Sequence, residues 1–336
     1  MQELLENLKV AFRDNTNQIY FLQVLKYLLK IEMKNPESSK RIEVIQKVYT
    51  KGRIMEMALS FLNKSNPKIL VKKALQLLNT ILLNNNPFVK DHLLNYLKTN
   101  ENYFGVFIFF KEKIKETSDY LFGKQKEIQK VNTRVVTLRT VGNLAEIKSV
   151  NHSEPGDPEL TCKIIRFLQL CCDNCYLPFQ NFLGTQNLDP DKANVDLVQQ
   201  LSLFMESFKN LSVLKDPSKE PNEVCKLASQ GFKTLIDMCT GPCLKNQEFF
   251  GNRRRLFRFI NWLIDVDSVN DLPGTYILIF SEAVKFLKTL TEGHNNKKIY
   301  KVMFEEINFS LMKTHANSIW SKRIQGREEV IYQENQ

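Results

Sequence analysis

Apolar residues recur every three or four positions along most of the chain, and this spacing is the strongest constraint on its fold. From Ile69 onward one stripe includes Leu75, Leu78 and Leu82, and it ends where Asn84-Asn85-Asn86-Pro87 interrupts the pattern. Such a period places apolar side chains on one face of an α-helix. Only 12 glycines and 11 prolines occur in 336 residues, which leaves few turn residues for many short strands. The sequence therefore predicts an all-α fold.

The predicted helices are about 12–20 residues long and are separated by short stretches rich in Asn, Pro, Ser or Gly. A second example of the stripe comprises Leu197, Leu201, Phe204, Phe208 and Leu211. Short connections favour antiparallel helix pairs that stack side by side. No strict sequence period emerges, so we expect an irregular armadillo/HEAT-like α-solenoid rather than a consensus repeat.

One segment departs from the helical pattern. Residues Val131 to Glu159 are rich in Thr, Val, Asn and Ser, and they contain Pro155, Gly156 and Pro158 close together. Two prolines and a glycine within four residues are typical of a loop or linker. The predicted organisation is a helical segment (1–130), an irregular linker (131–159), a second helical segment (160–325) and a tail (326–336).

The chain carries a formal net charge of +10, which is compatible with an acidic partner, nucleic acid or an anionic surface. Basic residues are spread throughout with acids among them, which favours a solvated surface. The one dense cluster, Arg253–Arg255 with Arg258, lies beside apolar residues, so we interpret it as the exposed face of a helix. No Lys or Arg register continues from helix to helix, and we expect no nucleic-acid partner.

Nothing in the sequence predicts secretion or membrane insertion. The N-terminus is acidic and amphipathic, without the apolar core of a signal peptide. The longest nearly continuous apolar run, Tyr103 to Phe110, has eight residues, far below the roughly 20 that a spanning helix needs. Seven cysteines, an odd number, indicate reduced thiols in the cytosol.

Two cysteine pairs raise the question of a metal or redox site. Cys172 and Cys175 form a C-x-x-C, and Cys239 and Cys243 form a second, wider pair. Four thiolates could bind zinc, but the second pair has an extra residue and contains a Gly-Pro turn. A redox C-x-x-C would be expected in a βαβ unit, which the sequence does not predict. We favour buried structural cysteines without zinc.

Enzyme chemistry has little support in the sequence. The four histidines are scattered singly, and none forms an H-x-x-H or H-E-x-x-H pattern. No glycine-rich phosphate-binding loop occurs either. We therefore predict that the protein is not an enzyme.

Two acids stand at predicted helix C-termini, where the negative end of the helix dipole disfavours them. Asp173 ends the helix that contains Ile164 and Leu168, and Asp237 stands four residues before Gly241. Each carboxylate shares its surroundings with unpaired carbonyl oxygens. If the two ends met, these hard oxygen ligands would suit calcium, whereas two ordinary surface acids are the simpler interpretation.

Several segments resemble a known family. Arg166–Asn187, with its Arg-Phe-Leu-Gln-Leu run, an acid and then Gln-Asn-Phe-Leu, is similar to inositol trisphosphate receptors and, more distantly, ryanodine receptors. Phe232–Phe250, with an acid before Gly-Pro-Cys, resembles a second segment of these calcium-release channels. Weaker similarity occurs in Lys40–Leu59, Leu77–Leu97 and Phe286–Ile307. The resemblance covers roughly residues 35 to 325.

The resemblance implies a cytosolic armadillo solenoid, including the receptor-homology-associated region, that relays signals between the ligand-binding amino-terminal domains and the pore. It implies a location at the cytosolic face of the endoplasmic reticulum membrane, with the other domains and subunits of a tetrameric channel as partners. In the family, two glutamates of this solenoid contribute half of an activating calcium site. Asp173 and Asp237 occupy the matching positions.

Both positions carry aspartate where the family has glutamate, and aspartate is one methylene shorter. Its oxygens therefore lie roughly 1.3–1.5 Å farther back, a large change compared with calcium–oxygen distances near 2.4 Å. We therefore expect Ca²⁺ binding to be weak and the site to be incomplete in this chain. The sequence shows no trisphosphate-binding domain and no pore, as expected of a channel fragment or a short family member. A stand-alone helical scaffold for protein interactions is the alternative.

Overall fold

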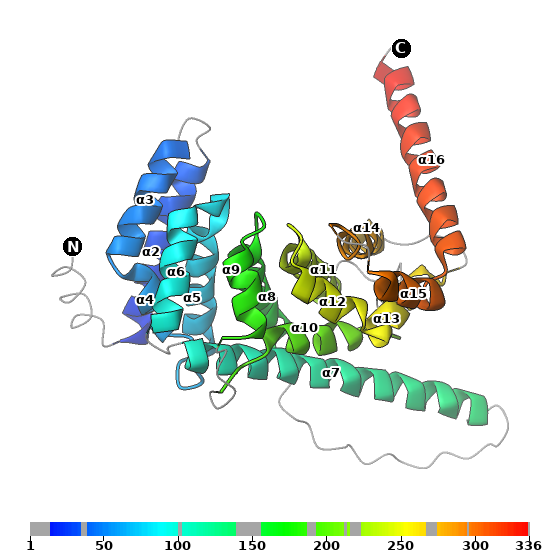
Figure 1. The fold of residues 1–336 in the computed structure, drawn as a ribbon, viewed down its shortest axis with the longest axis horizontal. Coiled ribbons are helices and arrows are strands. Elements are labelled where there is room, and N and C mark those ends of the chain that lie inside the picture. The colour runs from blue at the N-terminus through cyan, green and yellow to red at the C-terminus, as the bar shows by residue number, and fades with distance from the viewer. Residues whose placement is uncertain are drawn as a thin grey trace. The chain divides into compact units, whose positions relative to one another are not determined.

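The computed structural model describes residues 14–34, 39–99, 103–138, 156–186, 193–211, 214–215, 223–266, 274–293 and 296–334. Within these residues the chain forms helices and no strand (Figure 1), so the predicted all-α solenoid is confirmed. The first helices are α2 (Asn15–Met33), α3 (Ser39–Lys51), α4 (Ile54–Ser60), α5 (Lys68–Ile81), the 3₁₀ helix η1 (Leu83–Asn85), α6 (Pro87–Thr99), α7 (Tyr103–Leu138) and α8 (Pro158–Cys172). The remaining helices are α9 (Leu177–Gly184), α10 (Leu197–Glu206), α11 (Glu223–Cys239), α12 (Leu244–Gly251), α13 (Arg254–Ile264), α14 (Gly274–Thr289), α15 (Lys297–Glu306) and α16 (Phe309–Glu334).

The helices group into two compact units that are not continuous in sequence. The first unit comprises Met1–Lys115, Asp157–Gln200 and Asp237–Cys243. The second unit comprises Glu116–Gly156, Leu201–Ile236 and Leu244–Gln336. Helices α7, α10 and α11 therefore pass from one unit to the other, and the end of α11 belongs to the first unit.

Helix α5 forms the centre of the first unit. It contacts α2, α4 and α8. Its apolar face from Leu70 to Ile81 is buried because the stripe is wide enough to meet several neighbours, whereas Ile69 is exposed. The end of α5 is held by the buried side chain of Gln46, whose amide donates to the carbonyl oxygens of Ile81 and Leu83 at 2.8 and 2.7 Å. Asn86 in turn donates to Gln46 Oε1 at 3.0 Å. Gln46 thus satisfies carbonyl oxygens at the end of α5, and Asn86 of the Asn stretch orients the Gln46 amide.

Aromatic side chains form the core of the second unit. The rings of Phe232 and Phe259 stack with centroids 5.7 Å apart and planes 9° from parallel, and Phe286 packs against Phe232 at 6.3 Å. Such ring pairs stabilise a core beyond the area that they bury.

Two members of the arginine cluster, Arg254 and Arg258, pair with acids of α15. Arg254 forms ion pairs with Glu305 and Glu306, and Arg258 contacts Glu306 at 2.9 Å. Both arginine side chains are about half exposed, as expected for a solvent-exposed helix face. Pairing with glutamates leaves these guanidinium groups poorly suited to phosphate contacts.

The irregular conformation predicted for residues 131–159 differs from the structure at both edges of this segment. Residues 131–138 continue α7, and Pro158 and Glu159 begin α8, while 139–155 lie outside the described residues. A helix that has already formed extends at little cost even through β-branched residues. Residues 326–334 of the predicted tail likewise belong to α16.

Among the described residues, no helix combines the length and the apolar character that crossing a bilayer requires.

A candidate cation site at two helix ends

Helix α8 ends where the sequence predicts. Asp157 caps its start by accepting from the backbone N–H of Leu160 at 2.9 Å, with Pro158 in the first turn. The helix ends at Cys172, and Asp173 is its C-cap. Asn174 and Cys175 then adopt left-handed conformations with φ of 56° and 58°, which reverses the chain.

Helix α11 ends with Asp237 in its last turn, also as predicted. Gly241 follows with φ of 107°, a conformation that L side chains rarely adopt. A Cβ atom at Gly241 would lie 2.5 Å from Cys175 Cβ, so the turns after the two helices touch directly. Gln180 of α9 donates to the carbonyl oxygens of Asp237 and Thr240 at 2.7 and 2.8 Å. The two acid-bearing helix ends therefore lie together.

The Asp237 carboxylate belongs to a hydrogen-bonded chain on α8. Gln169 Nε2 donates to Asp237 Oδ2 at 2.6 Å, and Arg166 donates to Gln169 Oε1 at 2.6 Å. Burial raises the pKa of Asp237 to about 6, and the negative charge of Asp173 adds to this effect. The hydrogen bond from Gln169 and the positive charges of Arg166 and Lys90 oppose it. The charge of Asp173 therefore lies near enough to add to the effect of burial on Asp237.

Sequence reasoning missed Lys90, a buried cation that bonds the end of α8. Its side chain is only 2 % exposed, and Nζ donates to the Asp173 carbonyl at 2.5 Å and to Asn85 Oδ1 at 3.1 Å. The ammonium also lies 5.7 Å from the centre of the Tyr176 ring. Burial lowers the pKa of Lys90, while negative charges that include Asp173 and Asp237 oppose the change.

Lys90 compensates the negative end of α8, a role that the sequence argument gave to a divalent cation. One signal was available: Lys90 stands beside Val89 and three or four residues before Leu93 and Leu94, on the apolar face of α6. A lysine in such a stripe is a buried cation that needs oxygen partners.

The cysteines around the two turns differ in exposure. Cys172, Cys239 and Cys243 are buried, as predicted, whereas Cys175 is exposed. Burial raises the pKa of the Cys172 and Cys239 thiols, which disfavours the thiolate that zinc requires. The absence of zinc nevertheless stays a prediction.

As a calcium site, this arrangement is partial. Asp173 and Asp237 supply hard oxygen donors that fit calcium, but two carboxylates fall short of the about six to eight oxygens that the ion takes. Within the described part of the chain, no group of three or more His, Cys, Asp or Glu side chains could hold a metal ion. The metal assignment of the two acids remains a prediction.

Fold and site together define an α-solenoid with a carboxylate pair at adjoining helix ends. Residues 156–264, which contain both acids, match the family described as RyR and IP3R Homology associated. Over 165 residues the chain is 28% identical to the inositol 1,4,5-trisphosphate receptor itr-1 of Caenorhabditis elegans. That match covers 46% of this chain and 6% of the relative's length. The protein thus contains a region that matches the homology-associated family of ryanodine and inositol trisphosphate receptors, which confirms the resemblance noted in the sequence for residues 156–264.

Proposed function

We propose that the chain acts as a cytosolic regulatory solenoid of an inositol trisphosphate receptor-like calcium-release channel and contributes Asp173 and Asp237 to an activating calcium site. The observation that supports this function is the adjacency of the two acid-bearing helix ends, inside the family-matched region, where the turns touch at Gly241 and Cys175 and Gln169 and Gln180 hold Asp237. Under this proposal the chain works at the cytosolic face of the endoplasmic reticulum membrane. Its partners are other domains and subunits of the channel.

A bound calcium ion would supply positive charge to both carboxylates and so hold the ends of α8 and α11 together. Hydrogen bonds within the protein already orient the two carboxylates. Gln169 orients the Asp237 carboxylate, and the Asn174 N–H donates to Asp173 Oδ1 at 2.7 Å. Lys90 neutralises part of the negative charge, so calcium affinity of this chain alone is expected to be weak, near millimolar. Oxygens from a further channel domain would replace water and tighten binding.

Calorimetric titration of the purified chain with calcium tests this function. The double variant D173N/D237N should lose calcium binding while its circular dichroism stays helical. A matched control is E43Q/D119N, which removes two exposed acids of α3 and α7 that do not adjoin the site. The proposal fails if the unaltered chain binds no calcium at 10 mM, about tenfold above a near-millimolar constant, or if D173N/D237N binds as the control does.

A stand-alone helical scaffold is the second candidate function. The buried Lys90 ammonium favours it, because the negative end of α8 is compensated without any metal. A chain that binds no calcium and remains monomeric beside other channel domains would support the scaffold.

A further inference from the structure

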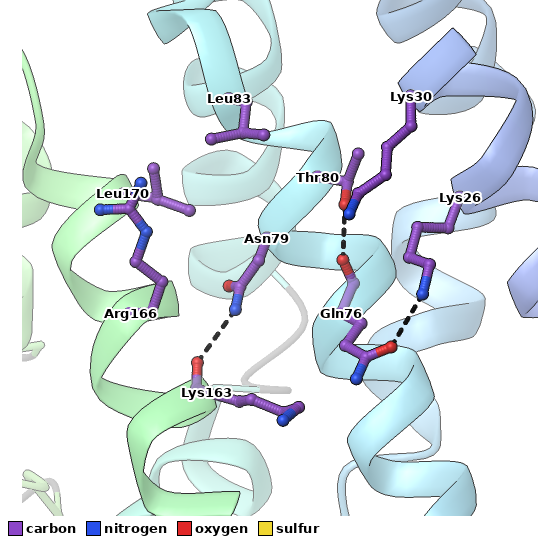
Figure 2. A pocket seen from close by; sticks show the side chains of 9 residues that line it. All are labelled: Lys26, Lys30, Gln76, Asn79, Thr80, Leu83, Lys163, Arg166 and Leu170. Carbon is purple, nitrogen blue, oxygen red and sulfur yellow. Dashed lines mark hydrogen bonds between the residues drawn. The ribbon is translucent and has the colours of Figure 1, made fainter. Parts of the chain in front are cut away.

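Positive side chains converge on a pocket in the first unit that the calcium proposal does not use. The pocket has a volume of about 480 Å³ and lies among α2, α5 and α8 (Figure 2). Four cations line it: Lys26 and Lys30 come from α2, and Lys163 and Arg166 come from α8. No acidic residue is among its lining residues. A pocket of this size suits a small molecule.

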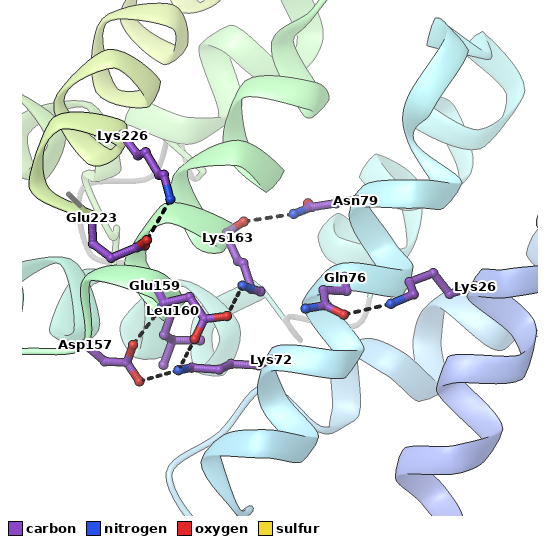
Figure 3. Close-up of polar contacts among 10 residues, drawn as sticks. All are labelled: Lys26, Lys72, Gln76, Asn79, Asp157, Glu159, Leu160, Lys163, Glu223 and Lys226. Atoms are coloured by element: carbon purple, nitrogen blue, oxygen red, sulfur yellow. Dashed lines mark hydrogen bonds and ion pairs between the residues drawn. The ribbon is translucent and has the colours of Figure 1, made fainter. Parts of the chain in front are cut away.

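The positive charge of the pocket is only partly compensated by neighbouring acids. Lys163 pairs with Glu159 at 2.5 Å, and Lys72 bridges Glu159 and Asp157 at 2.7 and 3.0 Å (Figure 3). Lys26 has a neutral partner, since its Nζ donates to Gln76 Oε1 at 2.9 Å.

Lys30 and Arg166 form no ion pair with any described residue. Burial and the charges of Lys73, Lys30 and Lys163 lower the pKa of Lys26, which shows how closely the like charges gather. An anion would relieve this repulsion.

Asn79 adds an acceptor to this set of donors. Its Nδ2 donates to the Lys163 carbonyl at 3.1 Å, whereas its Oδ1 is buried and accepts no hydrogen bond from the described residues. A buried acceptor without a donor costs about 1–3 kcal/mol. The pocket therefore suits a ligand that has both anionic oxygens and an O–H group.

We propose that this pocket binds a small multivalent phosphate-bearing anion. Lys26, Lys30 and Arg166 pair with phosphate oxygens, and a protonated oxygen of the ligand donates to Asn79. Arginine and lysine are the side chains that recognise phosphate. An acidic protein segment fits less well, because ionised Asp and Glu side chains are acceptors only and leave Asn79 Oδ1 without a donor.

The test titrates the full chain calorimetrically with inorganic pyrophosphate and, separately, with sulfate, which has no O–H at neutral pH. We expect pyrophosphate to bind at least tenfold more tightly than sulfate. The variant K26Q/K30Q should weaken pyrophosphate binding at least tenfold. The control K233Q/K297Q removes the same charge from exposed lysines that do not line the pocket, and it should bind within twofold of the unaltered chain.

If K26Q/K30Q loses helicity, K30Q alone serves, because Lys30 is exposed and forms no hydrogen bond within the described residues. It should weaken pyrophosphate binding at least threefold. Equal binding of pyrophosphate by K30Q and the control would overturn the proposal, as would equal affinity for sulfate. Binding of poly-glutamate without binding of pyrophosphate would instead assign the pocket to a protein segment. These outcomes do not depend on calcium, so either proposal can fail alone.

Discussion

Replacing Asp237 with asparagine should stabilise the protein at pH 8 and leave its stability nearly unchanged at pH 4. The folded structure raises the pKa of this carboxyl from 3.8 to about 6, mainly through burial. The native state therefore binds a proton more tightly than the unfolded chain does. The free energy of unfolding falls as the pH rises from about 4 to about 6 and is level above that. Asparagine keeps an oxygen for Gln169 but carries no charge.

The magnitude follows from the difference between 3.8 and about 6. One pKa unit corresponds to about 1.4 kcal/mol, so the ionised carboxylate lowers native stability by on the order of 3 kcal/mol at pH 8. Partial exposure of Asp237 reduces this figure, and we expect D237N to gain about 1–2 kcal/mol. Urea denaturation at pH 4, 5, 6, 7 and 8 measures the gain, and D119N on the exposed face of α7 is the control.

The reasoning is refuted if D237N and the unaltered chain show parallel stability profiles across this pH range, or if D237N is less stable at pH 8. Either result would mean that Lys90 and Arg166 outweigh burial at Asp237. The same denaturation series in 10 mM calcium, about tenfold above the expected binding constant, tests calcium binding separately. Calcium should raise the free energy of unfolding of the unaltered chain more at pH 8 than at pH 5. It should leave D237N unchanged.

Three further predictions concern the same helix ends. K90M should lower the free energy of unfolding by about 1–3 kcal/mol, because the Asp173 carbonyl loses its buried donor; calcium titration should show higher affinity in this variant, and equal or lower affinity would contradict the charge argument. G241A should destabilise by about 2 kcal/mol or more, because the backbone is left-handed and the new methyl meets Cys175, whereas G105A in α7 has open space and serves as the control. A G241A protein as stable as G105A would disprove the contact. Metal analysis of the purified protein should find less than about one tenth of an equivalent of zinc, because burial keeps thiols protonated. One equivalent of zinc that is lost on chelation would instead indicate a zinc site formed by Cys172, Cys175, Cys239 and Cys243.

The local spacing of apolar and turn residues was sufficient to predict the helices and to place Asp173 and Asp237 at helix C-termini. The apolar period marks which face each helix buries, and the Asn-Pro and Gly-Pro stretches mark where helices end. Asp173 and Asp237 could be assigned to helix ends for that reason. The division of the chain could not be predicted in this way, because the first unit gathers three separate segments and takes only the end of α11. Such grouping depends on long-range packing, which a linear pattern does not encode.

Lys90 and the basic pocket likewise could not be predicted from local sequence pattern. Each lysine of the pocket has an ordinary place on its own helix face, and only the approach of α2 and α8 to α5 turns them into one cluster. The sequence pattern likewise gives no sign that the Asn79 side-chain oxygen is buried and lacks a donor among the residues that the structure describes. Both proposed sites therefore depend on the packing of helices that are far apart in sequence.

Helix α8 connects the two proposed sites through Arg166. This guanidinium lines the pocket and donates to Gln169, which in turn holds Asp237. Arg166 also opposes the rise in the pKa of Asp237. An anion in the pocket would offset part of that positive charge, so the Asp237 carboxyl would hold its proton to higher pH. The same loss of positive charge favours a divalent cation beside the Asp237 carboxylate at pH 8, where this group is ionised, so anion binding would strengthen calcium binding, and calcium would strengthen anion binding by the same factor. The two proposed sites should therefore be cooperative, with helix α8 as the carrier of the coupling.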